Sequence, residues 1–174
     1  MGDKMSDVLI VVDIQNDFVN GALGTNEAVN IIPTAVDKIR TFKGDVIVTM
    51  DTHFDDYLNT PEGKNLPVPH CIKGTDGWDI HPCIKSALCG KDYTTIEKST
   101  FGTMKLPELV KDKTANITII GLCTDICVIS NAIILKNALP NAQITVDSSC
   151  CAGVTPQLHK SALDSMASCQ INII

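Results

Sequence analysis

The chain has 174 residues, a length typical of one domain with a single hydrophobic core. Its formal net charge of −6 argues against nucleic acid or an anionic membrane surface as the main partner, and no apolar run reaches the ~20 residues that a membrane span needs. Eight cysteines without a secretory signal favour a cytoplasmic protein with reduced thiols over a disulfide-linked secreted one.

Six short apolar segments rich in β-branched residues predict strands that are buried on both faces, as in a parallel sheet. In chain order these segments are residues 8–12, 45–50, 93–97, 116–120, 142–146 and 170–174. Strands that alternate with helices predict a three-layer α-β-α, Rossmann-like fold with a mostly parallel six-stranded sheet. No repeat or boundary divides the chain, so we expect one domain over residues 1–174.

Apolar residues at helical spacing lie between these strands and predict amphipathic helices. They are Ile32, Val36 and Ile39, then Val128, Ile129, Ala132 and Ile133, and later Leu158, Ala162, Leu163 and Met166. Thr155 and Pro156 are a typical N-cap and first-turn pair for the last of these helices. The stretch from Thr52 to Asp79 has no clear period, and a loop of that length is usually functional or mobile.

Titratable side chains come directly after four of the predicted strands. They are Asp13 after the first, Asp51 and His53 after the second, Lys98 after the third, and Cys123 and Cys127 after the fourth. Ligands of open α/β sheets bind outside the carboxyl ends of the strands. A single polar residue after one strand would most simply be a turn or cap residue. Titratable residues after four strands of the same sheet instead predict a binding site at the carboxyl ends of those strands.

The two cysteines lie in the segment GLCTDICV and are not equivalent. If Thr124 caps the following helix, Cys127 lies in the first turn, where free N–H groups and the helix dipole favour a thiolate. Lys98 would lower the pKa of that thiol further, and Asp13 could move its proton. These residues favour Cys127 as a nucleophile. A zinc pair and a purely structural role remain the alternatives, although zinc pairs are usually spaced more tightly and no second pair is present.

Three motifs in this order, VVDIQNDFVNGALG, EKSTFGT and GLCTDICV, resemble the isochorismatase-like cysteine hydrolases, specifically the nicotinamidase branch. The similarity spans about residues 7–174, so the resemblance implies one isochorismatase-like hydrolase domain. It implies a catalytic triad of Asp13, Lys98 and Cys127. It also implies a cis peptide bond between Leu122 and Cys123, and an oxyanion hole formed by the backbone N–H groups of Cys123 and Cys127.

The irregular stretch after the second strand holds Asp51, His53, Glu62 and His70. Carboxylate and imidazole ligands suit Zn, Fe or Mn, and the nicotinamidase resemblance implies a metal site here. The third ligand is open, because Asp55 or Asp56 could take the place of Glu62. The alternative interpretation is a set of ordinary solvated loop residues.

Phe18 and Phe101 could stack on a flat heteroaromatic substrate, although Phe18 could equally belong to the core. The resemblance implies a cysteine amidohydrolase that converts nicotinamide to nicotinate and ammonia through a thioester on Cys127. Two alternatives stay open: another isochorismatase-like cysteine hydrolase that acts on a different small amide, and a non-catalytic ligand-binding oligomer. The expected partners are a small-molecule amide and further copies of the chain. The apolar segment QINII and the low aromatic content are compatible with a dimer or a larger assembly.

Overall fold

The computed structural model describes residues 6–174, so residues 1–5 of the predicted domain lie outside it. Six strands form one sheet in the order β3-β2-β1-β4-β5-β6, and every neighbouring pair is parallel. The strands are β1 Asp7–Val12, β2 Asp45–Asp51, β3 Tyr93–Lys98, β4 Asn116–Leu122, β5 Gln143–Ala152 and β6 Asn172–Ile173. The predicted six-stranded parallel sheet is therefore confirmed.

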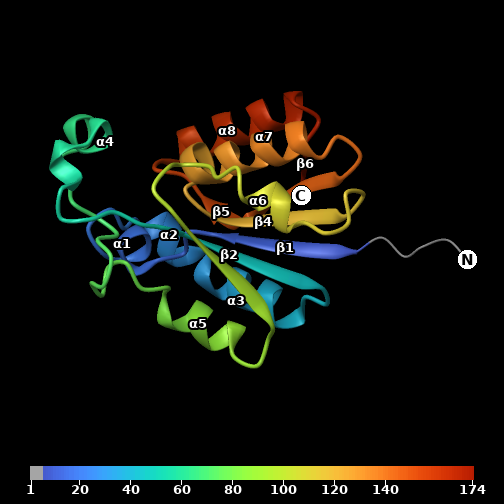
Figure 1. Ribbon diagram of the computed structural model, residues 1–174, viewed down its shortest axis with the longest axis horizontal. Helices are drawn as coiled ribbons and strands as arrows, with labels where there is room; N and C mark the ends of the chain where they lie inside the picture. The colour runs from blue at the N-terminus through green and yellow to red at the C-terminus, as the bar shows by residue number, and fades with distance from the viewer. Residues whose placement is uncertain (1–5) are drawn as a thin grey trace, which may run out of the picture.

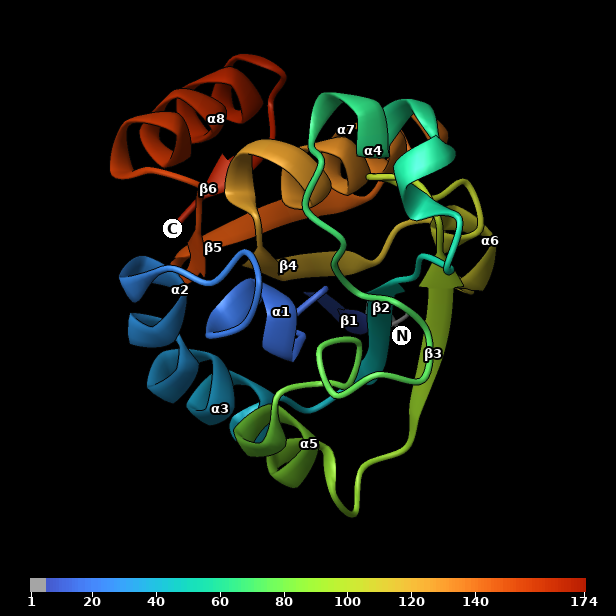
Figure 2. The ribbon, with the colours of Figure 1, turned by 90° about the vertical axis from the view of Figure 1, so that its left-hand side faces the viewer.

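Helices cover both faces of this sheet and complete the three predicted layers (Figure 1). One face carries α1 Asn16–Val19, α2 Asn26–Asn30, α3 Ile32–Thr41 and α5 Pro82–Leu88, and the other carries α6 Leu106–Leu109, α7 Ile129–Ala138 and α8 Pro156–Ser168. The turned view in Figure 2 shows α7 and α8 above the sheet and α3 and α5 below it. Each face has its own cluster of buried aliphatic side chains.

The expectation that all strands are buried on both faces is wrong for the two edge strands, β3 and β6. The segment predicted over residues 170–174 forms only the short strand β6, in which Asn172 is exposed and Ile173 is partly buried. Tyr93, Thr94, Thr95 and Glu97 are exposed, and only Ile96 and Lys98 are buried. The reason is topological, because β3 is an edge strand and pairs only with β2. At the centre, by contrast, the apolar residues of β1 from Val8 to Val12 are each at most 2% exposed. An apolar run alone does not reveal whether its strand lies at the centre or the edge.

The predicted helices are present, with differences in which side chains they bury. Thr155 is the N-cap of α8, as predicted, and its hydroxyl accepts a hydrogen bond from the N–H of Leu158 at 3.2 Å. Leu158 itself is 45% exposed, while Ala162 and Met166 face the core. None of the helices within residues 6–174 is long and apolar enough to cross a membrane.

Gly121 brings the end of β4 against the end of β1, where Val12 is its partner in the sheet. Its φ of +128° belongs to a region that side chains rarely adopt, and a Cβ here would overlap the carbonyl of Val12. Glycine therefore allows the turn that begins at Cys123 to start right beside Asp13. The segment between β2 and β3 leaves the sheet at the same edge, forms a 3₁₀ turn at Tyr57–Asn59 and continues as α4 Pro61–Asn65. Figure 1 shows α4 beyond the carboxyl ends of the strands.

Candidate active site

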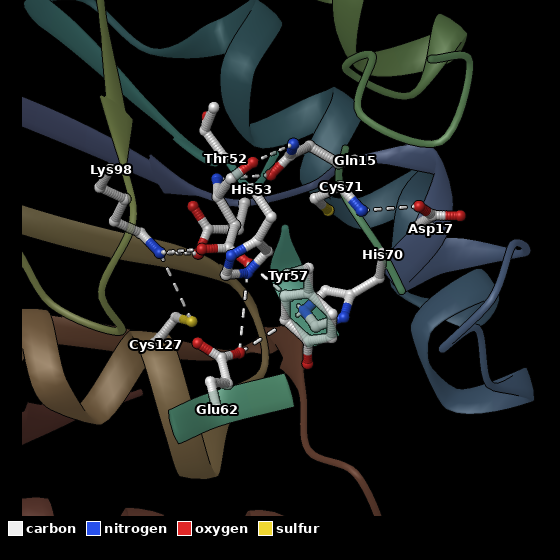
Figure 3. A network of polar contacts seen from close by, with 12 residues as sticks. Gln15, Asp17, Thr52, His53, Tyr57, Glu62, His70, Cys71, Lys98 and Cys127 are labelled. Carbon is white, nitrogen blue, oxygen red and sulfur yellow. Dashed lines mark hydrogen bonds and ion pairs between the residues drawn. The ribbon is translucent and has the colours of Figure 1, made fainter. Parts of the chain in front are cut away.

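Asp13, Lys98 and Cys127, predicted from three separate motifs, come together at this edge of the sheet. The ammonium nitrogen of Lys98 lies 2.6 Å from Oδ2 of Asp13 and 3.6 Å from Sγ of Cys127. All three residues are buried, with Asp13 completely inaccessible. Figure 3 shows Lys98 extending from β3 toward the sulfur of Cys127. Lys98 thus bridges a carboxylate and a thiol within one buried cluster.

The backbone of Asp13 turns sharply as β1 ends. Its φ is +49°, and Thr49 of the neighbouring strand fixes it twice. The N–H of Asp13 donates to the carbonyl of Thr49 at 3.1 Å, and the Thr49 hydroxyl donates to Oδ1 of Asp13 at 2.7 Å. Burial raises the pKa of Asp13, and the positive charge of Lys98 offsets part of that rise. A carboxylate with a raised pKa is a better proton acceptor than an exposed one.

Lys98 remains charged in this cluster. Burial alone would lower its pKa, but the negative charges of Asp13 and Asp51, together with that of Cys127 whenever it is a thiolate, outweigh that effect and raise it. Asp51 contributes from 3.5 Å, through Oδ1. The ammonium of Lys98 is therefore shared between the triad and the group of residues around Asp51.

The prediction that Cys127 has a lowered pKa is wrong. Burial raises its pKa well above that of a free thiol, the charge of Asp13 adds to the rise, and Lys98 offsets only part of it. The predicted cap is also wrong: Cys123 is the N-cap, and Thr124 is the first residue of a π-type turn, Thr124–Val128, that leads into α7. The resting side chain of Cys127 is thus a thiol, and it can attack as a nucleophile only after it passes its proton to a neighbour.

The role of Lys98 can be tested without substrate. We expect Lys98→Met to slow alkylation of Cys127 at pH 7 by about tenfold or more, because losing the nearest cation raises the thiol pKa and lowers the thiolate fraction. Alkylation at Cys127 is followed by peptide mapping across pH. Lys73→Met is the control, since Lys73 pairs with Glu97 at an exposed position. A Lys98→Met profile that coincides with wild type would show that Lys98 has no electrostatic effect on the sulfur.

Cys123 lies next to Cys127 in the same turn and is half-buried. The peptide bond between Leu122 and Cys123 is cis, as the resemblance implied. Burial raises the pKa of the Cys123 thiol to about 12, and Cys123 has no lysine contact of the kind that Cys127 has among the described residues. On the opposite side of the turn, the hydroxyl of Thr124 is hydrogen-bonded to Nδ1 of His159 at 2.8 Å, which ties the turn to α8.

The four predicted metal ligands converge into one candidate metal-binding group. One ligand atom from each of Asp51, His53, Glu62 and His70 lies within 4.8 Å of all the others. Oδ2 of Asp51 is 3.0 Å from Nε2 of His53 and 3.5 Å from Nε2 of His70. Oε1 of Glu62 is 3.7 Å from both imidazole nitrogens. Figure 3 shows Glu62 approaching from α4, opposite the two histidines.

These spacings fit a divalent transition metal. An ion about 2.0–2.2 Å from each ligand separates neighbouring ligand atoms by about 2.8–3.6 Å, close to the distances observed. Nδ1 of His70 is 2.8 Å from the carbonyl of Val68 and donates to it, so Nε2 carries the lone pair that faces the group. Asp55 and Asp56, the alternative third ligands, are exposed and stand outside the group. Glu62 therefore completes it.

A cavity of about 530 Å³ is lined by Cys127, beneath which Asp13 and Lys98 are buried, and by Asp51, Glu62 and His70 of the candidate metal group. Its walls are mostly apolar, and both predicted aromatic residues line it: Phe18 is buried, and Phe101 is 47% exposed. The other lining residues are Leu23, Pro61, Asn65, Leu66, Ser99, Thr100, Cys123 and Ile126. Trp78 is not among the lining residues. It packs, partly buried, against one of the two core clusters, and its indole N–H donates to the hydroxyl of Thr52.

Sequence reasoning missed several residues that shape this cavity. Ser99 and Thr100 directly follow Lys98, so their place in EKSTFGT could have indicated them. Asn65 and Leu66 had no such signal, because they lie at the end of α4 and directly after it, and this short helix has no apolar period. Tyr57 belongs to the surroundings of the metal group and was not predicted either. Its ring packs edge-on against those of His53 and His70, with centroids 4.7 and 5.0 Å away.

Comparisons with known proteins agree with this geometry. Residues 7–174 match the family model of the isochorismatase domain. A nicotinamidase/pyrazinamidase of Mycobacterium tuberculosis is 28% identical over 185 residues, which cover 95% of this chain and 97% of that protein. The crystal structure of a nicotinamidase/pyrazinamidase from Bacillus subtilis is similar with a TM-score of 0.84 at 28% identity, over 97% of this chain and 99% of that one.

A third similar protein bears on the metal group. The pyrazinamidase of Pyrococcus horikoshii was solved in complex with zinc, and it resembles this chain with a TM-score of 0.81 at 25% identity, over 97% and 98% of the two chains. The family match extends over nearly the whole sequence and includes every residue of the buried cluster and of the metal-binding group. The chain therefore belongs to the isochorismatase family.

Proposed function

We propose that this protein is a nicotinamidase, which hydrolyses nicotinamide to nicotinate and ammonia. Hydrolysis of a carbon–nitrogen amide bond is the coarser class, and family membership together with the nicotinamidase relatives supports it. The observation that carries the proposal is the buried cluster at the cavity floor, where Lys98 contacts both the Asp13 carboxylate and the Cys127 sulfur. We also propose that residues 1–174 form a single domain. We further propose that the protein works in the cytoplasm and assembles into a homo-oligomer.

The first half of the reaction forms a thioester. Asp13 takes the thiol proton of Cys127 as the sulfur attacks the amide carbonyl carbon. This transfer moves a negative charge between two groups that both contact Lys98, so the cluster keeps its net charge throughout. The backbone N–H groups of Cys123 and Cys127 donate to the resulting oxyanion. When the carbon–nitrogen bond breaks, Asp13 returns its proton to the leaving nitrogen, and ammonia departs.

The second half consumes the thioester. Asp13, again a carboxylate, accepts a proton from a water molecule whose oxygen attacks the same carbonyl carbon. The tetrahedral species collapses, the carbon–sulfur bond breaks, and the proton passes to the sulfur of Cys127. The product leaves as nicotinic acid and loses its proton to solvent to become nicotinate, and the cluster returns to its starting protonation state. One residue thus serves as acid and base in turn, which suits the raised pKa of Asp13.

The cavity supports an aromatic amide as the substrate. Its walls are apolar, and Phe18 and Phe101 are in position to contact a flat ring, while the carboxamide reaches the sulfur at the floor. Asp51, His53, Glu62 and His70 would hold Zn, Fe or Mn at the side of the same cavity. When bound, such an ion supplies a Lewis acid that can accept a ring nitrogen and so orient the substrate.

A screen for ammonia release tests this function. Nicotinamide, benzamide and small aliphatic amides are each supplied to the purified protein with Zn, Fe or Mn present. We expect the highest kcat/KM for nicotinamide and a lower value for benzamide, which has the same shape but lacks the ring nitrogen. A preference for an aliphatic amide would favour another cysteine hydrolase of the family, and no release from any amide would favour a non-catalytic ligand-binding protein.

A further inference from the structure

Gln15 holds the backbone of the candidate metal ligand Asp51 from both sides. Its side chain is fully buried, and Oε1 accepts a hydrogen bond from the N–H of Asp51 at 2.7 Å. Nε2 donates to the carbonyl of Asp51 at 2.9 Å and to that of Trp78 at 2.7 Å. Figure 3 shows this amide on the side of β2 away from Glu62. Gln15 thus fixes where Asp51 sits without touching the place that a metal would take.

Asp17 holds the backbone of the segment that carries His70 through a similar side-chain contact. Its Oδ2 accepts a hydrogen bond from the N–H of Cys71 at 2.8 Å, and Oδ1 accepts one from the N–H of Ala22 at 3.1 Å. Figure 3 shows this contact between Asp17 and Cys71. A side chain at Gly77 would overlap the Asp17 carboxylate, so the chain packs closely around it.

Cys71 connects Asp17 to the backbone of both histidines. It follows His70 directly, is fully buried, and has a φ of +46°, so its conformation determines how His70 leaves the chain. Its carbonyl accepts a hydrogen bond from the N–H of His53 at 2.9 Å, and the N–H of Lys73 donates to the carbonyl of His53 at 2.9 Å. The segments that carry the two imidazoles are therefore paired with each other, and Asp17 holds one of them.

Glu62 is held differently. It comes from α4 and its side chain is 22% exposed, whereas those of Asp51, His53 and His70 are at most 6% exposed. Three ligands thus form a fixed set anchored to residues 15 and 17, immediately after Asp13. One short segment, residues 13–17, supplies the acid of the triad and fixes the deep part of the metal group.

We infer that Gln15 and Asp17 are positioning residues that set the affinity of the site for a divalent metal. The inference rests on the metal-binding group of the proposed function. An ion gains the full benefit of three ligands only if they are held at the right spacing before it binds. Gln15 and Asp17 supply that order through main-chain hydrogen bonds to Asp51 and to the residue after His70.

Replacement of these residues should weaken metal binding. Asp17→Asn keeps the size of the side chain but offers only one acceptor oxygen for two N–H groups. Gln15→Met removes all three hydrogen bonds and keeps the volume and the apolar stem. We expect each change to raise the Kd for Zn and for Mn by about 10-fold to 100-fold, the effect usual for groups that hold metal ligands in place.

The control is Asp112→Asn. Asp112 also accepts two main-chain hydrogen bonds, from the N–H groups of Ser6 and Thr114 at 3.1 and 2.8 Å. It lies near the amino ends of β1 and β4, at the end of the strands opposite to the candidate site. We expect Asp112→Asn and Asp17→Asn to lower Tm alike, because each weakens two main-chain hydrogen bonds, and we expect Asp112→Asn to leave both Kd values unchanged. The comparison separates an effect on the site from a general loss of stability.

The experiment measures the Kd for Zn and for Mn of the full chain by competition with a chelator, with no substrate present. Because nicotinamide is absent, the result does not depend on whether that amide is hydrolysed. Weaker binding in Asp17→Asn and Gln15→Met, but not in Asp112→Asn, supports the inference. Wild-type affinity in the two site variants, an equal loss in Asp112→Asn, or a wild-type protein that binds neither metal would overturn it.

Discussion

Cys127→Ala is expected to abolish turnover, with a loss in kcat of at least ~10⁴-fold, while Cys123→Ala keeps much of the wild-type rate. The first change removes the sulfur that lies 3.6 Å from Lys98 at the cavity floor. The second removes only a thiol with a pKa of about 12 and retains the backbone N–H proposed to donate to the oxyanion. Ammonia release from nicotinamide, measured for both variants, gives the comparison.

The two variants are a matched pair, because each deletes one sulfur from the same turn. Thermal unfolding confirms that both are folded before their rates are compared. Equal losses in two folded variants would contradict the division of roles, since the Cys123 side chain would then take part in the reaction. Retention of activity in Cys127→Ala would exclude a thioester on this residue.

The second large effect concerns the metal group. Removing the metal with a chelator is expected to lower nicotinamide turnover by at least about 10²-fold, because three of the four ligands, Asp51, Glu62 and His70, line the same cavity as Cys127. Alkylation of Cys127 by a small reagent should persist, since Lys98 and Asp13 stay in place. His53→Ala should behave like the metal-free protein. Glu62→Ala should lose less, because its side chain is the most exposed of the four.

Two controls accompany this experiment. Elemental analysis confirms that the metal has left, and adding back Zn, Fe or Mn identifies which ion restores the rate. Asp55→Ala should resemble wild type, because Asp55 is exposed and stands outside the group. Full turnover in protein shown to be metal-free would contradict a catalytic role for the group and leave the triad as the whole of the active site.

Much of the fold could be predicted because its central strands carry strong signals. The apolar segments of β1 and β4 are buried on both faces, so their composition reflects their surroundings directly. The edge strand β3 and the two-residue strand β6 were harder to predict, because their burial and length depend on which strand lies beside them. Pairing is set by tertiary contacts, which a local pattern of apolar residues does not contain.

The candidate site followed a similar division. Asp13 follows β1, Lys98 ends β3, and Cys127 lies in the turn after β4. Their common location was predictable from topology, since parallel strands end at one side of the sheet. The pKa of Cys127 could not be predicted from the sequence. It depends on how deeply the sulfur is buried and on how close Lys98 lies to it, and these two effects oppose each other. Gln15 and Asp17 were overlooked, although polar residues at alternate positions after a buried strand are a signal that the sequence does contain.

The most direct test of the account is to trap the intermediate on Cys127. Protein mixed with nicotinamide is quenched in acid within the first turnover, and its peptides are mapped by mass. We predict a nicotinoyl group on the peptide that contains Cys127, which forms and decays at rates consistent with steady ammonia release and is absent from Cys127→Ala. Ammonia release at the wild-type rate with no acyl group on Cys127, or with one on another residue, would contradict the account.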